Sequence, residues 1–341
     1  MKYILQPSTD PHFNMAFDEF CLDGLQADEP VFYLWRNRPS VIIGLNQSPY
    51  AEVDLGFLEE RGITLARRVT GGGAVYHDLQ NLNYTITGRI RDLEKDGPAY
   101  LETMLRALRK LGVPAQRSGR NDLLVDGRKC SGYAKRLSGN RLMIHGTLMY
   151  DVDIDTLTRA LSVPGSKLSA AGIASVRSRV ANLKGYLPGF AGIDAFQDAL
   201  QECLADGDGQ IRLDPSQIKM IEADADAKFR TWEWNFGRSP AASFHVGGRF
   251  ACGSVEASFS LHAGRLDGVR FTGDFLGNLP AGRIENALQG LPYTRAALLE
   301  ALEKTPVEDC FDGVTPEQMA ALLLDRAQGD RSQQTGREQG R

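Results

Sequence analysis

Hydrophobic and polar residues alternate along the chain with the period of a helix in some stretches and of a strand in others. Apolar side chains spaced three and four positions apart predict an amphipathic helix over residues 10–26. Further helices are predicted at 51–62, ending near Gly62, and at 97–112, ending before Pro114. Apolar or alternating runs predict strands at 3–6, 31–37, 39–44, 63–69, 81–90 and 141–152.

The second half begins with a predicted hairpin and continues with a mainly helical pattern. Residues 121–136 are expected to form two strands joined by a turn at Asp126-Gly127. The pattern is helical from 157 to 229, and small, turn-forming residues at 235–242 suggest a linker. Beyond the linker, strands joined by glycine turns precede helices at 295–304 and 316–328.

This order of elements predicts an α+β fold rather than regular βαβ repeats. We expect a large domain at 1–242 with mixed, mostly antiparallel sheets flanked by helices. A small α/β accessory domain is expected at 245–328. The polar residues 329–341 contain too few apolar side chains to pack and are expected to be disordered.

Composition and charge narrow the class of protein. The chain has 341 residues, of which 42% are hydrophobic and 24% charged, as is typical of a soluble globular protein. The net charge of −4 provides no general attraction to nucleic acid or to an anionic membrane. The amino terminus lacks a long apolar segment, and five scattered cysteines form no CxxC pair. We therefore expect a cytoplasmic monomer without nucleic-acid or membrane partners.

Three consecutive glycines, Gly71 to Gly73, lie between two predicted strands in RRVTGGGAVYHD. They could form a flexible turn, or a bare backbone that an anionic ligand approaches closely. The stretch is neither a P-loop nor GxGxxG. Strand alternation predicts that Arg67 and Arg68 face opposite sides, one functional and the other solvated. His77 could pair with Asp78 in a turn or contact a ligand, and no zinc site is predicted.

A second group of polar residues lies in the predicted hairpin. Asn121 and Asp122 could simply cap a turn, and Lys129 could be an exposed hairpin charge. Cys130, next to this lysine, could be an acyl-carrying nucleophile or a small buried side chain. Because neighbouring residues of a strand face opposite sides, a catalytic pair of Lys129 and Cys130 is not expected.

Together, these segments resemble the bacterial lipoate-protein ligases of the biotin/lipoate ligase and octanoyltransferase superfamily. The resemblance covers most of residues 1–330 in the blocks LWRN, VIIGLNQSPYAEV, LARRVTGGGAVYHDLQNLNYT, SGRNDLLVDGRKCSGYAKR, HGTLMYDVDIDTL, GIASVRSRVANL and WEWNFGRSPAASF. It implies a two-step reaction, in which ATP and lipoate form lipoyl-AMP and pyrophosphate and a lysine of an acceptor protein then takes the lipoyl group. The implied acceptors are lipoyl domains of 2-oxo-acid dehydrogenase E2 subunits and the glycine-cleavage H protein.

The resemblance also implies roles for individual residues. Lys129 is expected to contact both lipoate and the adenylate phosphate, and Asp122 is expected near Mg²⁺. Asp122 is also our candidate base for the transfer step. The remaining nucleotide contacts are expected from Arg68, Gly73, Ala74, Val75, Tyr76 and Asn121. Lipoate contacts are expected from Gly72, Gly73 and His77, with an apolar tunnel to which Val41, Ile42 and Ile43 contribute.

Two positions depart from the family pattern. Cys130 stands where the family usually has an aliphatic residue, and Ile144 precedes His145 where the family often has a second histidine. Cys130 leaves an ATP-independent octanoyl or lipoyl acyltransferase as an alternative, and a non-catalytic binder as a third. The GRGRxG signature of biotin ligases is absent, which disfavours biotin and DNA. We also expect that side chains at Gly72 or Gly73 would block the adenylate rather than the fold.

Overall fold

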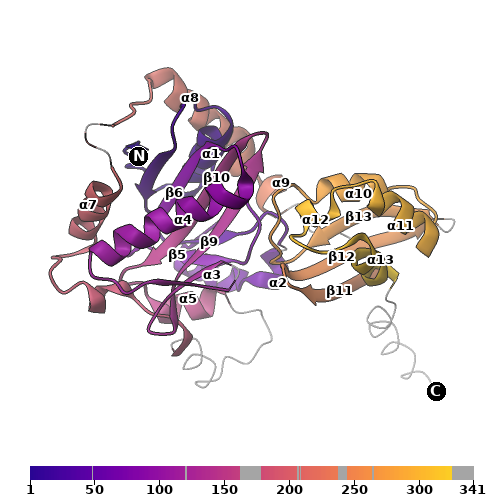
Figure 1. Ribbon diagram of the computed structural model, residues 1–341. Coiled ribbons are helices and arrows are strands. Elements are labelled where there is room, and N and C mark those ends of the chain that lie inside the picture. Colours follow the sequence, from indigo (N-terminus) through magenta and orange to yellow (C-terminus); the bar gives the residue numbers. More distant parts are fainter. Residues whose placement is uncertain are drawn as a thin grey trace, which may run out of the picture. The chain divides into compact units, whose positions relative to one another are not determined.

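A seven-stranded sheet is the centre of the larger part of the computed structural model, which describes residues 1–47, 49–119, 121–161, 178–205, 207, 209–236, 244–262 and 265–324 (Figure 1). The strand order is β1 (Lys2–Tyr3), β2 (Val31–Trp35), β6 (Asn81–Arg89), β10 (Arg141–Met149), β9 (Arg128–Ser138), β8 (Asp122–Val125) and β7 (Gln116–Ser118). Only β1 and β2 pair in parallel within this sheet. The mixed, mostly antiparallel sheet confirms the predicted α+β class.

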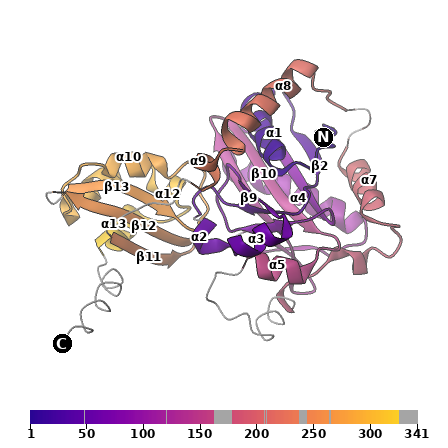
Figure 2. The ribbon, with the colours of Figure 1, turned by 180° about the vertical axis from the view of Figure 1, so that it is seen from behind.

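Helices pack on both faces of this sheet (Figures 1 and 2). One face is apolar and packs against α4 (Leu93–Lys110) and α7 (Ile193–Leu204). The other face packs against α1 (Pro11–Asp23), which in turn contacts α8 (Pro215–Asp224) and the π-helical turn Ala225–Phe229. Helix α1 begins after Asp10, whose carboxylate accepts a hydrogen bond from the backbone amide of His12, as in a normal N-cap.

A second, three-stranded sheet holds the strands on either side of the three glycines. Its order is β4 (Thr64–Arg67), β3 (Ser40–Ile43) and β5 (Val75–His77). The helix predicted at 51–62 is divided into α2 (Pro49–Glu52) and α3 (Leu55–Arg61). The division arises because Asp54 caps α3 by accepting a hydrogen bond from the amide of Phe57. Gly62 ends α3 with a φ of 61°, as the sequence predicted. Helix α5 (Ile154–Ala160) packs against α3 and β5.

The smaller part contains an antiparallel sheet of β11 (Phe244–Phe250), β12 (Gly253–His262) and β13 (Arg265–Thr272). Four helices follow: α10 (Gly282–Leu288), α11 (Arg295–Glu303), α12 (Val307–Cys310) and α13 (Pro316–Leu324). These elements share a core that includes Phe259, Phe271 and Phe311.

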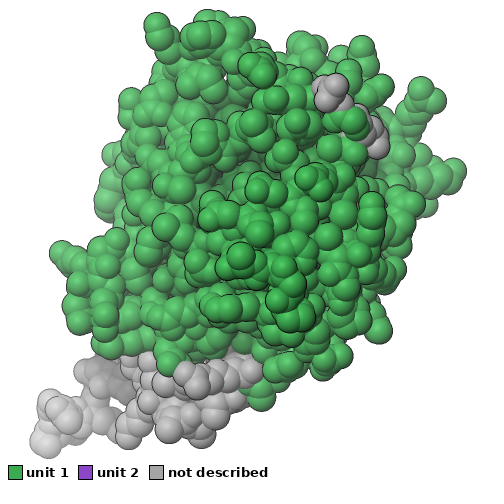
Figure 3. Space-filling view, turned by 90° about the vertical axis from the view of Figure 1, so that its left-hand side faces the viewer, with its two compact units in different colours: residues 1–43, 49–70, 74–237 green, residues 44–48, 71–73, 238–341 purple. Residues whose placement is uncertain are grey.

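Two compact units result, and Figure 3 shows the larger one from one side. The larger one comprises residues 1–43, 49–70 and 74–237, and the smaller one comprises 44–48, 71–73 and 238–341. Residues 242 and 243 of the predicted domain boundary at 242–245 lie outside the described residues, and so does the whole tail at 329–341. No helix in the described ranges is long and apolar enough to cross a membrane.

Candidate active site

A β-bulge in β9 decides which residue of the neighbouring pair Lys129 and Cys130 lies beside Asp122. Asp122 pairs with Gly132 and Leu123 with Ser131, but Leu124 then pairs with Lys129, so Cys130 is the extra residue. Regular alternation counted from Gly132 would have placed Cys130 on the same face as Gly132. The bulge brings the lysine to that face instead.

Lys129 and Asp122 form an ion pair, with 2.8 Å between Nζ of the lysine and Oδ1 of the aspartate. The two side chains are 40% and 35% exposed, so a ligand can reach them. Gly132 makes room for the lysine, because a Cβ atom at this position would lie 3.1 Å from Nζ. Asn121 precedes β8, and its carbonyl accepts a hydrogen bond from the amide of Tyr133. Asn121, Asp122 and Lys129 are therefore neighbours, as predicted.

Cys130 points into the apolar core between the sheet and α4. It is completely buried, and its thiol lies 3.4 Å from the carbonyl of Leu123. Burial raises the pKa of this thiol to about 12. As the sequence predicted, Lys129 and Cys130 do not share a pocket. A protonated, buried thiol is a poor acyl-transfer nucleophile.

Polar side chains form a row on the face of the large sheet that packs against α1. In register across the strands, Trp35 pairs with Asn83, and Asn83 pairs with Thr147. The hydroxyl of Thr147 accepts a hydrogen bond from the amide of Gly132, which itself pairs with Asp122. Side chains of directly opposed residues share one face of a sheet. The ion pair thus stands at the end of a polar row that begins at Trp35.

Arg68 is linked to the same face by a buried chain of hydrogen bonds. Its Nε donates to the hydroxyl of Thr70, and this hydroxyl lies 2.7 Å from Nε2 of His145. Nδ1 of His145 lies 2.6 Å from Oδ2 of Asp18, and as a carboxylate oxygen can only accept, Nδ1 is the donor. Asp18 also accepts hydrogen bonds from Tyr33 and Thr85. Burial lowers the pKa of Arg68 to about 10, so the guanidinium remains charged at neutral pH.

Sequence patterns did not indicate the roles of Asp18, Thr70 and His145. Asp18 lies within the helix predicted at 10–26 and matches no motif, and His145 stands out only in the departure from the family pattern at Ile144. All three are polar or charged residues that are buried. Because buried polar groups need hydrogen-bond partners, polar residues within apolar segments could have been predicted to pair with one another.

Arg67 corrects a prediction, because it is one of the most buried side chains of the chain rather than a solvated charge. Its Nε donates to the carbonyl of Trp234, and Nη2 donates to the carbonyl of Asn235. Both carbonyls belong to α9 (Trp232–Asn235), whose last carbonyls lack partners within the helix. The side-chain oxygen of Asn235 also accepts from the amide of Arg67. Helix α9 therefore fixes the end of β4, directly before Arg68.

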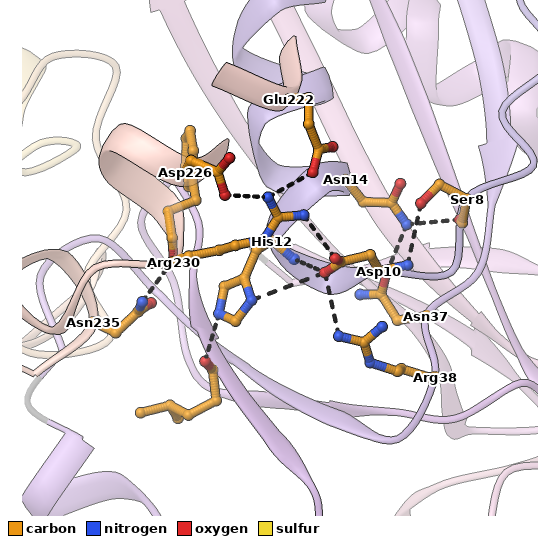
Figure 4. A network of polar contacts seen from close by, with 12 residues as sticks. Ser8, Asp10, His12, Asn14, Asn37, Arg38, Glu222, Asp226, Arg230 and Asn235 are labelled. Carbon is orange, nitrogen blue, oxygen red and sulfur yellow. Dashed lines mark hydrogen bonds and ion pairs between the residues drawn. The ribbon is translucent and has the colours of Figure 1, made fainter. Parts of the chain in front are cut away.

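A cluster of charges holds the segment before α9 against α1 (Figure 4). Arg230 donates to Glu222 and Asp226, both at 2.7 Å, and to Asp10 at 2.8 Å. Asp10 is the N-cap of α1, so the cluster ties α8 and the π-helical turn to the start of that helix. This explains how a segment more than 160 residues away in sequence reaches Arg67.

Strand β5 separates the predicted ligand residues onto two faces. Tyr76 packs into a core with Val41 and Ile43, whereas Val75 packs with Ile42 on the side of α1. Of the three residues expected to line the apolar tunnel, only Ile42 therefore lies on the side that faces α1. Ala74 packs against the same core as Tyr76. A nucleotide contact from Tyr76 would have to come from its backbone.

His77 is buried and does not pair with Asp78. Nδ1 of His77 lies 3.1 Å from the side-chain nitrogen of Asn37, and the ring packs edge-on against Trp35. Burial lowers the pKa of His77 to about 3, and the positive charge of Arg68 acts in the same direction. The Asp78 carboxylate instead accepts from the amides of Gln80 and Asp153. His77 is thus near Arg68 and beside Trp35, the first residue of the polar row.

The three glycines group with the smaller unit, and they differ in how strongly their position demands a glycine. A Cβ at Gly71 would lie 2.6 Å from the carbonyl oxygen of Phe275, and the amide of Gly72 donates to that oxygen. Gly72 has a φ of 91°, which strains any other residue. Gly73 has room for a Cβ, 3.8 Å from Asp274. The expectation that a side chain would spare the fold therefore does not extend to Gly72.

Metal binding by this site would depend on a nucleotide. Within the described ranges, no group of three His, Cys, Asp or Glu side chains could hold a metal ion. Mg²⁺ is commonly held by one or two carboxylates together with substrate phosphates. Asp122 can supply one such carboxylate, so the site fits Mg²⁺ that arrives with ATP.

Comparisons with known proteins agree on one family. Residues 10–205 match the lipoyl protein ligase A/B catalytic domain, and residues 239–323 match the bacterial lipoate protein ligase C-terminus. Lipoate-protein ligase LplJ of Bacillus subtilis is 35% identical over 324 residues, covering 93% of this chain and 98% of the relative.

Two solved structures are also similar. A bipartite lipoate protein ligase from Thermoplasma acidophilum has a TM-score of 0.62 and 30% identity, over 71% of this chain and 98% of that one. A lipoate-protein ligase A bound with ATP has a TM-score of 0.59 and 30% identity, over 69% and 98%. With a family model matching more than half of its length and a relative this similar over nearly all of it, the chain belongs to the lipoate-protein ligase family.

Proposed function

We propose that this enzyme activates lipoate with ATP and then transfers the lipoyl group to a lysine of an acceptor protein. The observation that carries the proposal is the position of Lys129. The bulge in β9 places its ammonium group on the polar sheet face, where Asp122 holds it at 2.8 Å. A fixed positive charge at this place is what the first step requires.

In the first step, a carboxylate oxygen of lipoate attacks the α-phosphorus of ATP. A new P–O bond forms, the bond to pyrophosphate breaks, and lipoyl-AMP results. Two anions approach each other, so a preorganised cation between them stabilises the transition state. We assign this role to Lys129, with Arg68, Asn121, and the backbone of Gly73 to Tyr76 as nucleotide contacts. Mg²⁺, near Asp122, would neutralise charge on the phosphates.

In the second step, the acceptor lysine attacks the acyl carbon of lipoyl-AMP and AMP leaves. A lysine with an ordinary pKa near 10.4 is almost entirely protonated at neutral pH. A base must therefore remove a proton, and we propose Asp122, because its carboxylate is partly exposed on the same face as Lys129. Lipoate itself would contact Gly72, Gly73, His77 and Lys129.

Acceptor proteins are proposed from the comparisons and from the family chemistry. The archaeal neighbour was described together with its E2 lipoyl domain. We propose apo lipoyl domains of 2-oxo-acid dehydrogenase E2 subunits and the glycine-cleavage H protein as acceptors for this chain. The enzyme would act as a monomer in the cytoplasm, where its free cysteines remain reduced.

One assay tests the function directly. The protein is incubated with lipoate and an apo lipoyl domain, with or without ATP, and the acceptor is weighed by mass spectrometry. We expect a mass gain of one lipoyl group only with ATP, accompanied by pyrophosphate release. A gain from an acyl carrier donor in the absence of ATP would overturn the proposal, and so would the absence of any gain.

A further inference from the structure

The hydrogen bonds around His77 determine which of its ring nitrogens carries the proton. His77, Asn37 and Asn14 are all buried. His77 is the last residue of β5, Asn37 follows β2, and Asn14 lies in α1. The side-chain nitrogen of Asn14 lies 3.0 Å from the carbonyl of Ser8 and 3.2 Å from that of Arg36. An oxygen facing two carbonyl oxygens would be repelled, so the amide orientation of Asn14 is fixed by the backbone.

The orientation of the Asn14 amide determines that of the Asn37 amide. The Asn14 nitrogen donates to the side-chain oxygen of Asn37 at 2.8 Å (Figure 4). The other end of the Asn37 amide is therefore its nitrogen, which can only donate, and it lies 3.1 Å from Nδ1 of His77. Nδ1 must accept this bond as an unprotonated nitrogen. In the neutral ring the proton is consequently on Nε2.

Nε2 of His77 is a buried atom with no hydrogen-bond partner among the described residues. Buried polar groups in native proteins nearly always have a partner, and an unmet donor costs about 1–3 kcal/mol. The ring is neutral at physiological pH because burial lowers its pKa to about 3. The site therefore presents a neutral N–H donor that lacks an acceptor, beside Trp35 and near Arg68.

We propose that Asn37, oriented by Asn14, is a positioning residue that keeps His77 in the Nε2–H form, and that this N–H donates to a carboxylate oxygen of the acyl substrate. The identity of the substrate rests on the proposed function. The tautomer does not, because it follows from contacts within the chain. A neutral donor orients the carboxylate without forming an ion pair that attack on phosphorus would have to break.

Nitrogen NMR of protein labelled with ¹⁵N-histidine tests the tautomer in the full-length enzyme. The chain has five histidines, and the His77→Gln variant identifies the His77 signals by their loss. Protonated and unprotonated ring nitrogens have well-separated chemical shifts. We expect a protonated Nε2 and an unprotonated Nδ1 without substrate, and a shift of Nε2 when lipoate is added. The opposite tautomer would overturn the relay, and an unmoved Nε2 would overturn the substrate contact.

Asn37→Asp tests the relay by replacing the donor with a carboxylate oxygen. Nδ1 should then carry the proton, so Nε2 becomes an acceptor and KM for lipoate should rise about 10- to 100-fold, with KM for ATP unchanged. Asn37→Leu removes the donor without adding charge and should leave a mixture of tautomers. Asn182→Asp makes the same chemical change where the amide bonds both backbone groups of Val152, and should leave the His77 signals unchanged.

The two proposals fail in different ways. If the wild-type tautomer is as expected but no lipoyl-AMP forms, the relay stands and the proposed function does not. If lipoyl-AMP forms while Asn37→Asp leaves both the tautomer and KM for lipoate unchanged, the function stands and the relay is wrong. Should the aspartate variant not fold, the wild-type spectrum alone still decides the tautomer.

Discussion

Nζ of Lys129 lies 2.8 Å from Oδ1 of Asp122, although the two residues belong to different strands and are separated by a hairpin turn and a bulge. A partly exposed ion pair of this kind contributes little to stability, on the order of 1 kcal/mol or less. The ion pair instead positions the lysine, because the aspartate keeps the ammonium group on the polar face of the sheet. Lys129 and Asp122 can therefore be tested by activity with small effects on folding.

Lys129→Ala should reduce lipoyl-AMP formation about 10²- to 10³-fold, as expected for the loss of one preorganised charged donor. Pyrophosphate release measures this step. Cys130→Ser is the matched control, because the neighbouring side chain points into the core and should leave adenylate formation unchanged. A reversed pattern, with the serine variant inactive, would favour the acyltransferase.

Gly132→Ala should lower adenylate formation on the order of 10- to 100-fold while the protein still folds. The new methyl group would lie 3.1 Å from Nζ of Lys129, and the flexible lysine would move away. Gly185→Ala is the control, since a Cβ there meets nothing within 4 Å. Circular dichroism and pyrophosphate release separate folding from activity. Full activity of Gly132→Ala would show that the lysine does not need its present position.

Asp122→Asn should slow lipoyl transfer from preformed lipoyl-AMP about 10²-fold, the lower range for the loss of a general base. A single-turnover assay with added lipoyl-AMP and an apo lipoyl domain isolates this step. The defect should shrink as pH rises, because more of the acceptor lysine is then already neutral. Transfer at the wild-type rate would exclude Asp122 as the base.

Asn235→Ala should lower the free energy of unfolding by about 2–3 kcal/mol, because it removes three hydrogen bonds to backbone groups in a buried place. The lost contacts are those to the amide of Arg67 and to the carbonyls of Phe229 and Thr231. Urea denaturation provides the measurement. Glu233→Ala, on the exposed side of the same helix, should change the midpoint little, and equal effects from both variants would contradict the role given to Asn235.

His77 should make stability fall as pH is lowered. Its pKa is about 3 in the folded protein and near 6.5 when unfolded, so between these values the unfolded chain binds the extra proton. Above about pH 6.5 this residue does not reduce the free energy of unfolding. Between about pH 6.5 and pH 3 the free energy of unfolding falls by up to about 1.4 kcal/mol for each pH unit. In urea denaturation between pH 7 and 4.5, His77→Gln should show a shallower decline than wild type. Parallel curves would contradict a neutral, buried His77.

Local features of the fold were predictable because they depend on neighbouring residues. Asp126 and Gly127 have φ values of 49° and 74°, as a tight hairpin of the predicted kind requires. Asp and Gly are among the residues that accept positive φ, so the sequence alone places this turn. Alternation likewise predicted that Lys129 and Cys130 face opposite sides, and the motifs around them indicated the family.

What alternation could not determine is which of these two residues faces the ligand. A single bulge reverses that choice, and bulges depend on how β8 and β9 pair rather than on the pattern of either strand. The burial of Arg67 was missed for a related reason, since its partners Trp234 and Asn235 lie more than 160 residues away. No local periodicity records such a contact.

Patterns along the chain were enough to predict most of the elements, the family and the residue types that can bring charge to a carboxylate and a phosphate. The partners of these residues follow from tertiary contacts: Asp18 for His145, Asn37 for His77, and Asp122 for Lys129 across the bulge. Helix and strand periods specify which face of one element a side chain occupies. Its partners depend on which elements the sheet order and the helix packing bring against that face.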